Sequence, residues 1–232
     1  MAEILNCNAL CKNYGRIRAL DNFSLTLESG RIVGLLGPNG SGKTTIIKII
    51  NGLLTPNSGQ VTICGMSPSP ETKALVAYLP DNIYLNGWMT IQQIVNYFAE
   101  FYADFRTELA MEMLQRLGVC PKQKLKTLSK GNKEKVCLIL TMSRNAKLYV
   151  LDEPIAGVDP AARDYVISTI INNYNPEATV LISTHLIADI EPILDEVVFI
   201  REGKAVLQKS VETIREEEGK SVDELFREVF RW

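Results

Sequence analysis

The chain has 232 residues, of which 46% are hydrophobic, and a formal net charge of −2. This length and apolar content suffice for one α/β domain with a large core. The near-neutral charge gives no electrostatic indication of nucleic-acid binding, so no nucleic-acid partner is expected. The five scattered cysteines form no CxxC pair, which argues against a disulfide framework or a zinc site and favours a reducing compartment. No apolar run approaches the roughly 18 residues of a membrane span.

The first third of the chain alternates between strand and helix patterns. Residues 4–28 are predicted to form antiparallel strands, because apolar and polar residues alternate from Phe23 to Glu28. The short apolar run at residues 32–36 is typical of a buried parallel strand. Residues 45–51 are predicted to form an apolar helix that Gly52 ends, and residues 61–63 a short strand.

The middle of the chain has a helical character. Apolar residues recur at helical spacing between Thr90 and Gly118, and we predict that residues 84–143 form a helical lobe inserted between sheet strands. An aromatic stripe lies there, and packing of the lobe is its simplest interpretation. A hairpin is predicted around residues 201–204, followed by a helical tail over residues 208–232. The aromatic stripe consists of Tyr97, Phe98, Phe101, Tyr102 and Phe105.

A phosphate-binding motif follows the run at residues 32–36. Residues 37–44 satisfy G-x-x-x-x-G-K-[ST] between a predicted strand and a predicted helix, so backbone N–H groups can converge on phosphate oxygens. Lys43 suits the β- and γ-phosphates, Thr44 suits Mg²⁺, and Thr45 can reach the α-phosphate. The guanine-reading NKxD motif is absent. The candidate nucleotide-binding residues of the motif are Gly37, Pro38, Asn39, Gly40, Ser41, Gly42, Lys43, Thr44 and Thr45.

Polar residues with suitable chemistry end two further apolar runs. Asp152 and Glu153 follow residues 148–151, and Thr184 and His185, the only histidine, follow residues 179–183. Parallel strands end at one edge of a sheet, so these side chains are expected to meet Lys43 there. Asp152 is expected to bind Mg²⁺, Glu153 to polarise the attacking water, and His185 to contact the γ-phosphate. The alternatives are a helix-capping acid pair and an ordinary surface or core histidine.

Two more segments complete an ordered set of five motifs. They are Leu128-Ser129-Lys130-Gly131-Asn132 and Ala156-Gly157-Val158-Asp159. From Tyr14 to about Lys204, the chain resembles the nucleotide-binding subunits of ABC transporters. The resemblance implies a P-loop NTPase core that binds ATP and Mg²⁺. It also implies that Tyr14 stacks on adenine, that Ser129 and Gly131 belong to the family signature, and that Asp159 links two sites across a dimer.

Three positions depart from the family pattern. Lys130 stands where the signature usually has its first glycine, and Asn132 stands where it ends in glutamine. Asp81 occupies the end of a loop that normally carries glutamine, and we expect Asp81 to bind Mg²⁺ or to orient water. Lysine signatures of this kind resemble those of export-type bacterial subunits.

The resemblance implies an ATPase motor subunit of a membrane exporter. It would work as a homodimer or heterodimer that sandwiches ATP, with a separate transmembrane permease subunit as partner. This places the chain in the cytoplasm, peripheral on the inner face of the cell membrane. One alternative is a soluble ABC-type ATPase acting on ribosomes or nucleic acid, which only a lysine cluster near residues 122–135 supports. Another is a nucleotide-gated regulator with negligible turnover, against which Glu153 argues.

Overall fold

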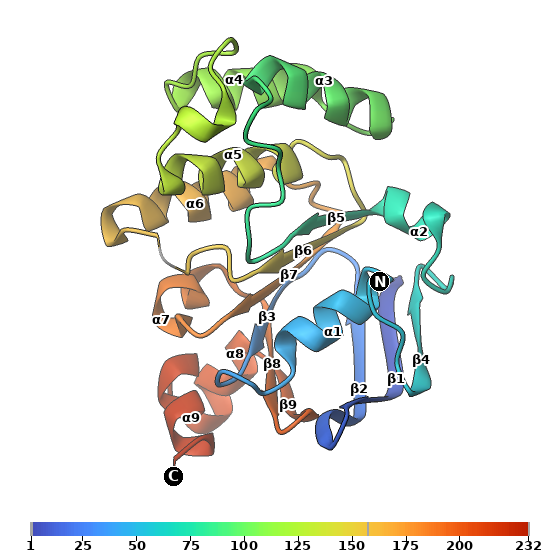
Figure 1. Cartoon of the computed structure of the whole chain (residues 1–232). Helices are drawn as coiled ribbons and strands as arrows, with labels where there is room; N and C mark the ends of the chain where they lie inside the picture. Colours follow the sequence, from blue (N-terminus) through green and yellow to red (C-terminus); the bar gives the residue numbers. More distant parts are fainter. Residues whose placement is uncertain (1, 157, 232) are drawn as a thin grey trace.

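The fold combines two β-sheets with a helical lobe (Figure 1). The computed structural model describes residues 2–156 and 158–231, so Gly157 and the two terminal residues of the expected 1–232 domain lie outside the described residues. The N-terminal sheet is antiparallel and the second sheet is mostly parallel. The lobe is inserted between two neighbouring strands of the second sheet. The predicted fold class is therefore confirmed.

The antiparallel sheet has the strand order β2-β1-β4. In β2, Phe23, Leu25 and Leu27 are buried while the residues between them are exposed, because one face of the sheet covers a core and the other meets solvent. The buried side chains pack with the apolar side of α1 and with one face of the second sheet. The elements are β1 (Glu3–Tyr14), β2 (Ile17–Glu28), β4 (Ser58–Ile63) and α1 (Lys43–Ile50).

The second sheet has the strand order β5-β6-β7-β3-β8-β9. Its three central strands are buried along their whole length, which explains their uninterrupted apolar sequences. Alternate side chains enter different cores: Val33 and Leu35 face α1, whereas Ile32 and Leu36 face the helices on the other side. Strands β8 and β9 form the predicted hairpin. The strands are β3 (Ile32–Leu36), β5 (Val76–Leu79), β6 (Leu148–Asp152), β7 (Thr179–Thr184), β8 (Glu196–Arg201) and β9 (Lys204–Ser210).

The helical lobe shares one helix with the main core. Val136, Ile139 and Leu140 of α5 pack into the lobe, while Cys137 and Leu138 on its other side pack against the parallel sheet. A helix buried on both sides joins the lobe firmly to the sheet. The lobe contains α3 (Ile91–Phe101), α4 (Thr107–Arg116), the 3-10 turn η1 (Leu125–Thr127) and α5 (Lys130–Met142).

The aromatic stripe of α3 divides between two faces. Phe98 is buried and its ring packs on Tyr102 and Phe105, as predicted for lobe packing. Tyr97 and Phe101 lie one helical turn apart on the opposite face of α3. Their rings stack on each other there and are largely exposed. The packing interpretation is therefore wrong for these two residues.

One strand had no counterpart in the sequence-based prediction. Tyr78 and Leu79, which precede the loop that ends at Asp81, belong to β5. This strand follows the short helix α2 (Pro70–Leu75) and pairs with β6 at the edge of the sheet. A four-residue strand shows little periodicity, and its pairing partner lies about 70 residues away in the sequence. Its existence depends on the sheet.

The C-terminal segment packs against the parallel sheet. Strand β9 extends to Ser210, so the helical part of the tail begins at residue 211. Phe226 and Phe230 pack on Phe199 of β8. Within the described residues, no helix combines the length and the apolar character required to cross a bilayer. The remaining helices are α6 (Pro160–Asn173), α7 (Ile187–Ile190), η2 (Glu191–Ile193), α8 (Val211–Thr213), the π-turn η3 (Ile214–Glu218) and α9 (Val222–Val229).

Candidate nucleotide site

The phosphate loop lies between β3 and α1, and two glycines allow its backbone path. A Cβ at Gly37 would lie 2.4 Å from the carbonyl oxygen of Ile200. Gly42 has a φ of +113°, and a Cβ there would lie 2.7 Å from the carbonyl oxygen of Ala19. The loop therefore packs directly on β2 and β8. The N-terminus of α1 follows it, beyond the carboxyl end of β3, where an anion would be stabilised.

The other loop residues differ in exposure. Ser41 is buried, and its hydroxyl has no hydrogen-bond partner among the residues that the structure describes. An unpartnered buried hydroxyl fits a loop that is completed by a ligand. The exposed residues are Asn39 and Gly40, and the half-buried residues are Pro38, Gly42, Thr44 and Thr45.

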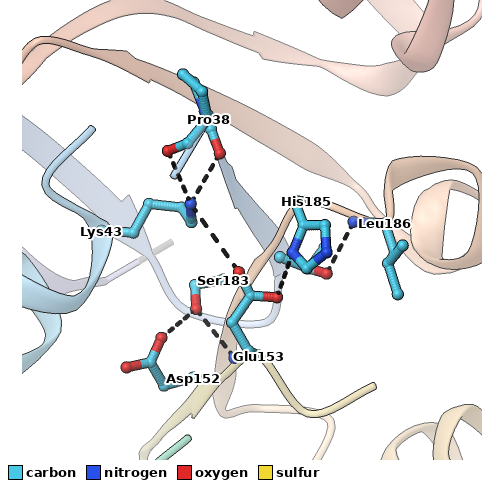
Figure 2. A network of polar contacts seen from close by, with 9 residues as sticks. Pro38, Lys43, Asp152, Glu153, Ser183, His185 and Leu186 are labelled. Carbon is cyan, nitrogen blue, oxygen red and sulfur yellow. Dashed lines mark hydrogen bonds and ion pairs between the residues drawn. The ribbon is translucent and has the colours of Figure 1, made fainter. Parts of the chain in front are cut away.

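The Lys43 ammonium group is held by the loop itself (Figure 2). Its Nζ donates hydrogen bonds to the carbonyl oxygens of Gly37 at 2.7 Å and Pro38 at 3.2 Å. It also lies 4.0 Å from Oε1 of Glu153. Burial lowers the pKa of Lys43, while the nearby carboxylates of Glu153 and Asp152 raise it and offset part of that effect. The sequence-predicted lysine and glutamate therefore share one site.

Asp152 lies at the end of β6 and is almost completely buried. Oδ1 accepts a hydrogen bond of 2.5 Å from the Ser183 hydroxyl, while Oδ2 is buried with no partner within residues 2–156 and 158–231. Burial raises the pKa of Asp152, and the hydroxyls of Ser183 and Thr44 counteract this shift. A buried carboxylate oxygen without a donor suits a cation ligand.

Ser183 is a site residue that the sequence analysis missed. Its hydroxyl donates to Asp152 and accepts a hydrogen bond of 3.1 Å from the backbone N–H of Glu153 (Figure 2). Strands β6 and β7 are paired so that Asp152 lies opposite Ser183. The available signal was a small polar residue at the end of an apolar strand, but its partner depends on strand register.

Glu153 and His185 form a direct pair. Nδ1 of His185 lies 3.0 Å from Oε2 of Glu153, and an ionised carboxylate only accepts, so the imidazole donates. Glu153 has a φ of +51°, a strained backbone for a residue with a side chain. Its N–H donates to the carbonyl oxygen and the hydroxyl of Ser183, which stabilise this conformation. The carboxylate is thereby held between His185 and Lys43.

Asp81 joins the same region from the far end of β5. It lines a small cavity of about 40 Å³ together with Asp152 and Glu153, and Asn82 donates a hydrogen bond of 2.8 Å to it. Glu134 of the helical lobe also lines this cavity, and its buried Oε2 has no partner within the described ranges. The sequence analysis did not identify Glu134, because nothing in its helix indicates which strand ends it faces.

Four predicted residues lie outside this network. Tyr14, Ser129, Gly131 and Asp159 are exposed, and no hydrogen bond or ion pair between described residues joins them to Lys43, Asp152, Glu153 or His185. The Ser129 hydroxyl caps α5 by accepting a hydrogen bond from the N–H of Asn132, and Asp159 immediately precedes α6. Tyr14 ends β1 with 47% of its surface exposed.

Comparison with known proteins identifies the family. The family model described as ABC transporter matches residues 20–156, which is more than half of the chain. The uncharacterized ABC transporter ATP-binding protein YdbJ of Bacillus subtilis is 36% identical to this chain. The similarity covers 91% of this chain and 71% of that protein.

Solved structures agree in fold. An ATP-binding subunit of an ABC transporter matches with a TM-score of 0.87 at 28% identity, over 98% of this chain and 100% of that chain. The dimeric ATP-binding cassette MJ0796 bound to ADP and Pi has a TM-score of 0.78, over 89% of this chain and 98% of that chain. At 20% identity, the second likeness shows the fold alone.

Proposed function

This chain belongs to the ABC transporter family of ATP-binding proteins, and on that premise we propose that it powers a membrane exporter by hydrolysing MgATP. A cassette of this family binds nucleotide and is the ATPase motor of an ABC transporter. The observation that carries the proposal is the network of Lys43, Asp152, Glu153 and His185 beyond the ends of β3, β6 and β7. The lysine-containing signature supports the export assignment by resemblance.

The residues around Asp152 fit a Mg²⁺ ion that arrives with the nucleotide. Among the described residues, no group of three or more His, Cys, Asp or Glu side chains could hold a metal ion. The unpartnered Oδ2 of Asp152, the hydroxyl of Thr44 and the carboxylate of Asp81 would provide oxygen ligands that the triphosphate completes. When bound, Mg²⁺ would neutralise charge on the β- and γ-phosphates.

The remaining charged groups suit the hydrolysis of a γ-phosphate. The Lys43 ammonium group, already aimed along the loop, would bind β- and γ-phosphate oxygens. Glu153 would orient the attacking water and accept its proton. The hydrogen bond from His185 would orient the Glu153 carboxylate, and the imidazole would contact the γ-phosphate. We assign these three residues as the catalytic set.

The exposed residues suit a second copy of a cassette. Ser129 and Gly131 lie at the exposed N-terminus of α5, where they would contact the γ-phosphate bound by the other subunit. Asp159 would contribute across the same two-fold interface, and Tyr14 would stack on adenine. Either a homodimer or a heterodimer satisfies this geometry. The ATP-binding cassette MJ0796, which has a similar fold, is dimeric, and this supports the proposed arrangement.

A groove between the sheet and the lobe suits the permease subunit. It has a volume of about 560 Å³ and aromatic walls that include Tyr84, Phe98 and Tyr102. Lys73 on its wall is exposed, so the groove would accept a short helix with an apolar face and an acidic residue. Such a partner would hold the chain on the inner face of the cell membrane.

The Glu153→Gln variant tests the proposal. Gln keeps the size of Glu153 but cannot accept a proton, so we expect phosphate release to fall at least ~100-fold while MgATP binding persists. ATP should then trap a dimer in size-exclusion chromatography with light scattering. The matched control is Glu177→Gln, an exposed carboxylate before β7, which should keep wild-type turnover. Unchanged phosphate release in Glu153→Gln would refute the catalytic assignment.

Co-purification tests the partner. The trapped variant should be recovered with a membrane-spanning protein from detergent-solubilised membranes. Recovery with ribosomes instead would favour the soluble ATPase alternative.

A further inference from the structure

The guanidinium group of Arg144 joins the helical lobe to the start of β5. Arg144 lies between α5 and β6, and only 3% of its side chain is exposed. On the lobe side, its Nε donates a hydrogen bond of 2.5 Å to Oδ1 of Asp104. Its guanidinium carbon lies 3.7 Å from the centre of the Tyr102 ring, a close cation–π contact. The charge is therefore paired by two groups of the segment between α3 and α4.

The other edge of the same guanidinium group contacts the end of α2 and the first residue of β5. One Nη donates a hydrogen bond of 2.6 Å to the carbonyl oxygen of Ala74, and the other lies 3.5 Å from that of Val76. The N–H of Lys147 donates to the intervening carbonyl of Leu75 at 2.9 Å. Three consecutive carbonyl groups are thus held by one short loop. Because β5 is an edge strand, these contacts supplement its pairing with β6.

Strand β5 leads directly from these contacts to Asp81. The strand runs from Val76 to Leu79, and Asp81 follows after one proline. Arg144, Tyr102 and Asp81 all line the groove of about 560 Å³ between the lobe and the sheet. Asp81 also lines the small cavity beside Asp152 and Glu153. One strand therefore connects the groove to the proposed metal site.

We propose that Arg144 is a positioning residue that transmits the position of the helical lobe through β5 to Asp81. The inference rests on the proposed function and extends it to the way in which groove occupancy would control hydrolysis. A displacement of Tyr102 and Asp104 would shift the guanidinium group of Arg144. Its hydrogen bonds to the carbonyl groups of Ala74 and Val76 would then shift the start of β5 as well. A planar group with five donors can hold both sides at once, whereas the single ammonium of lysine cannot.

A double-mutant cycle in the full chain tests the coupling. We expect Arg144→Lys to lower kcat about tenfold while KM for MgATP changes less than about twofold, because Asp81 contributes to the reaction and little to ground-state binding. Asp81→Ala should lower kcat by a similar factor. In the Asp81→Ala background, Arg144→Lys should cause no further loss, since both changes remove one contribution.

Arg106→Lys is the matched control. The Arg106 guanidinium also donates to backbone carbonyls in this region, those of Met142, Arg144 and Asn173, but makes no hydrogen bond to residues 74–76 within the described chain. We expect Arg106→Lys to lower Tm and leave kcat unchanged. If Arg144→Lys does not fold, Asp104→Asn takes its place, because it weakens the lobe side and leaves the contacts to β5.

The outcomes separate the two proposals. Losses of kcat that multiply in the double variant would overturn the coupling through Asp81 and leave the proposed function standing. An unchanged kcat in Arg144→Lys would also overturn the coupling and leave the proposed function standing. An unchanged kcat in Asp81→Ala would instead remove Asp81 from the proposed metal site, and the coupling with it.

Discussion

The two halves of the proposed nucleotide site differ in how far a single chain completes them. Around Lys43, Asp152 and Glu153 the side chains are mostly buried and each charged group has a partner or a nearby opposite charge. At Ser129 and Gly131 the backbone is exposed and no contact reaches the first half within the described residues. The difference indicates that the first half is preorganised by its own sheet, whereas under the proposed function the second half is completed by another subunit.

Preorganisation follows from the sheet. Parallel pairing of β6 with β7 places Asp152 opposite Ser183. Glu153 and His185 directly follow the ends of these two strands and lie within hydrogen-bonding distance of each other. Groups that are oriented before the reaction need no rearrangement when charge develops on a phosphate. The exposed half has no comparable constraint, so its contribution should appear only in an assembled complex.

Removing Lys43 is expected to reduce ATP turnover more than any other substitution proposed for the two halves of the site. Lys43→Ala deletes the only ammonium group in the buried network, and we expect ATP turnover to fall roughly 1,000-fold. Nucleotide affinity, measured by equilibrium binding, should fall as well. Lys220→Ala, in the C-terminal segment and outside the buried network, is the matched control and should behave as wild type. Turnover near the wild-type rate in Lys43→Ala would contradict the assignment of the phosphate loop.

His185 tests whether the buried half acts as one unit. His185→Ala removes the hydrogen bond that orients Glu153, and we expect kcat to fall roughly 100-fold with MgATP binding retained. His185→Gln keeps a donor at this position and should lose less. A loss of binding in a folded His185→Ala protein, measured by calorimetry with a circular dichroism control, would make the residue structural.

A substitution at Gly131 tests the exposed half of the proposed site. A Cβ at Gly131 would meet no described atom within 4 Å, outside the helix's own nearby backbone, and the residue lies in α5. Gly131→Ala should therefore stabilise the single chain by about 0.5–1 kcal/mol. In the proposed ATP sandwich, the methyl group would press against the nucleotide bound by the other subunit, and we expect kcat to fall about tenfold. Urea unfolding and ATPase assays measure both effects. Unchanged turnover would argue against the proposed interface.

Local patterns in the sequence were sufficient for the main parts of the fold and site. The apolar runs ending at Leu36, Leu151 and Ser183 predicted central strands, and the structure confirms them because buried parallel strands require continuous apolar sequence. The glycine and lysine spacing predicted the phosphate loop for a similar reason, since its backbone geometry depends on neighbouring residues. These features involve contacts within a few positions of the chain.

The tertiary structure alone decided which distant groups meet. Ser183 bridges Asp152 and Glu153 through the register of two strands, and Glu134 reaches the small cavity through the packing of the lobe. Strand β5 and its attachment to Arg144 depend on partners about 70 residues away. Such contacts leave little trace in local periodicity, because the free energy that selects them arises from burial and hydrogen bonding between segments that are remote in the chain.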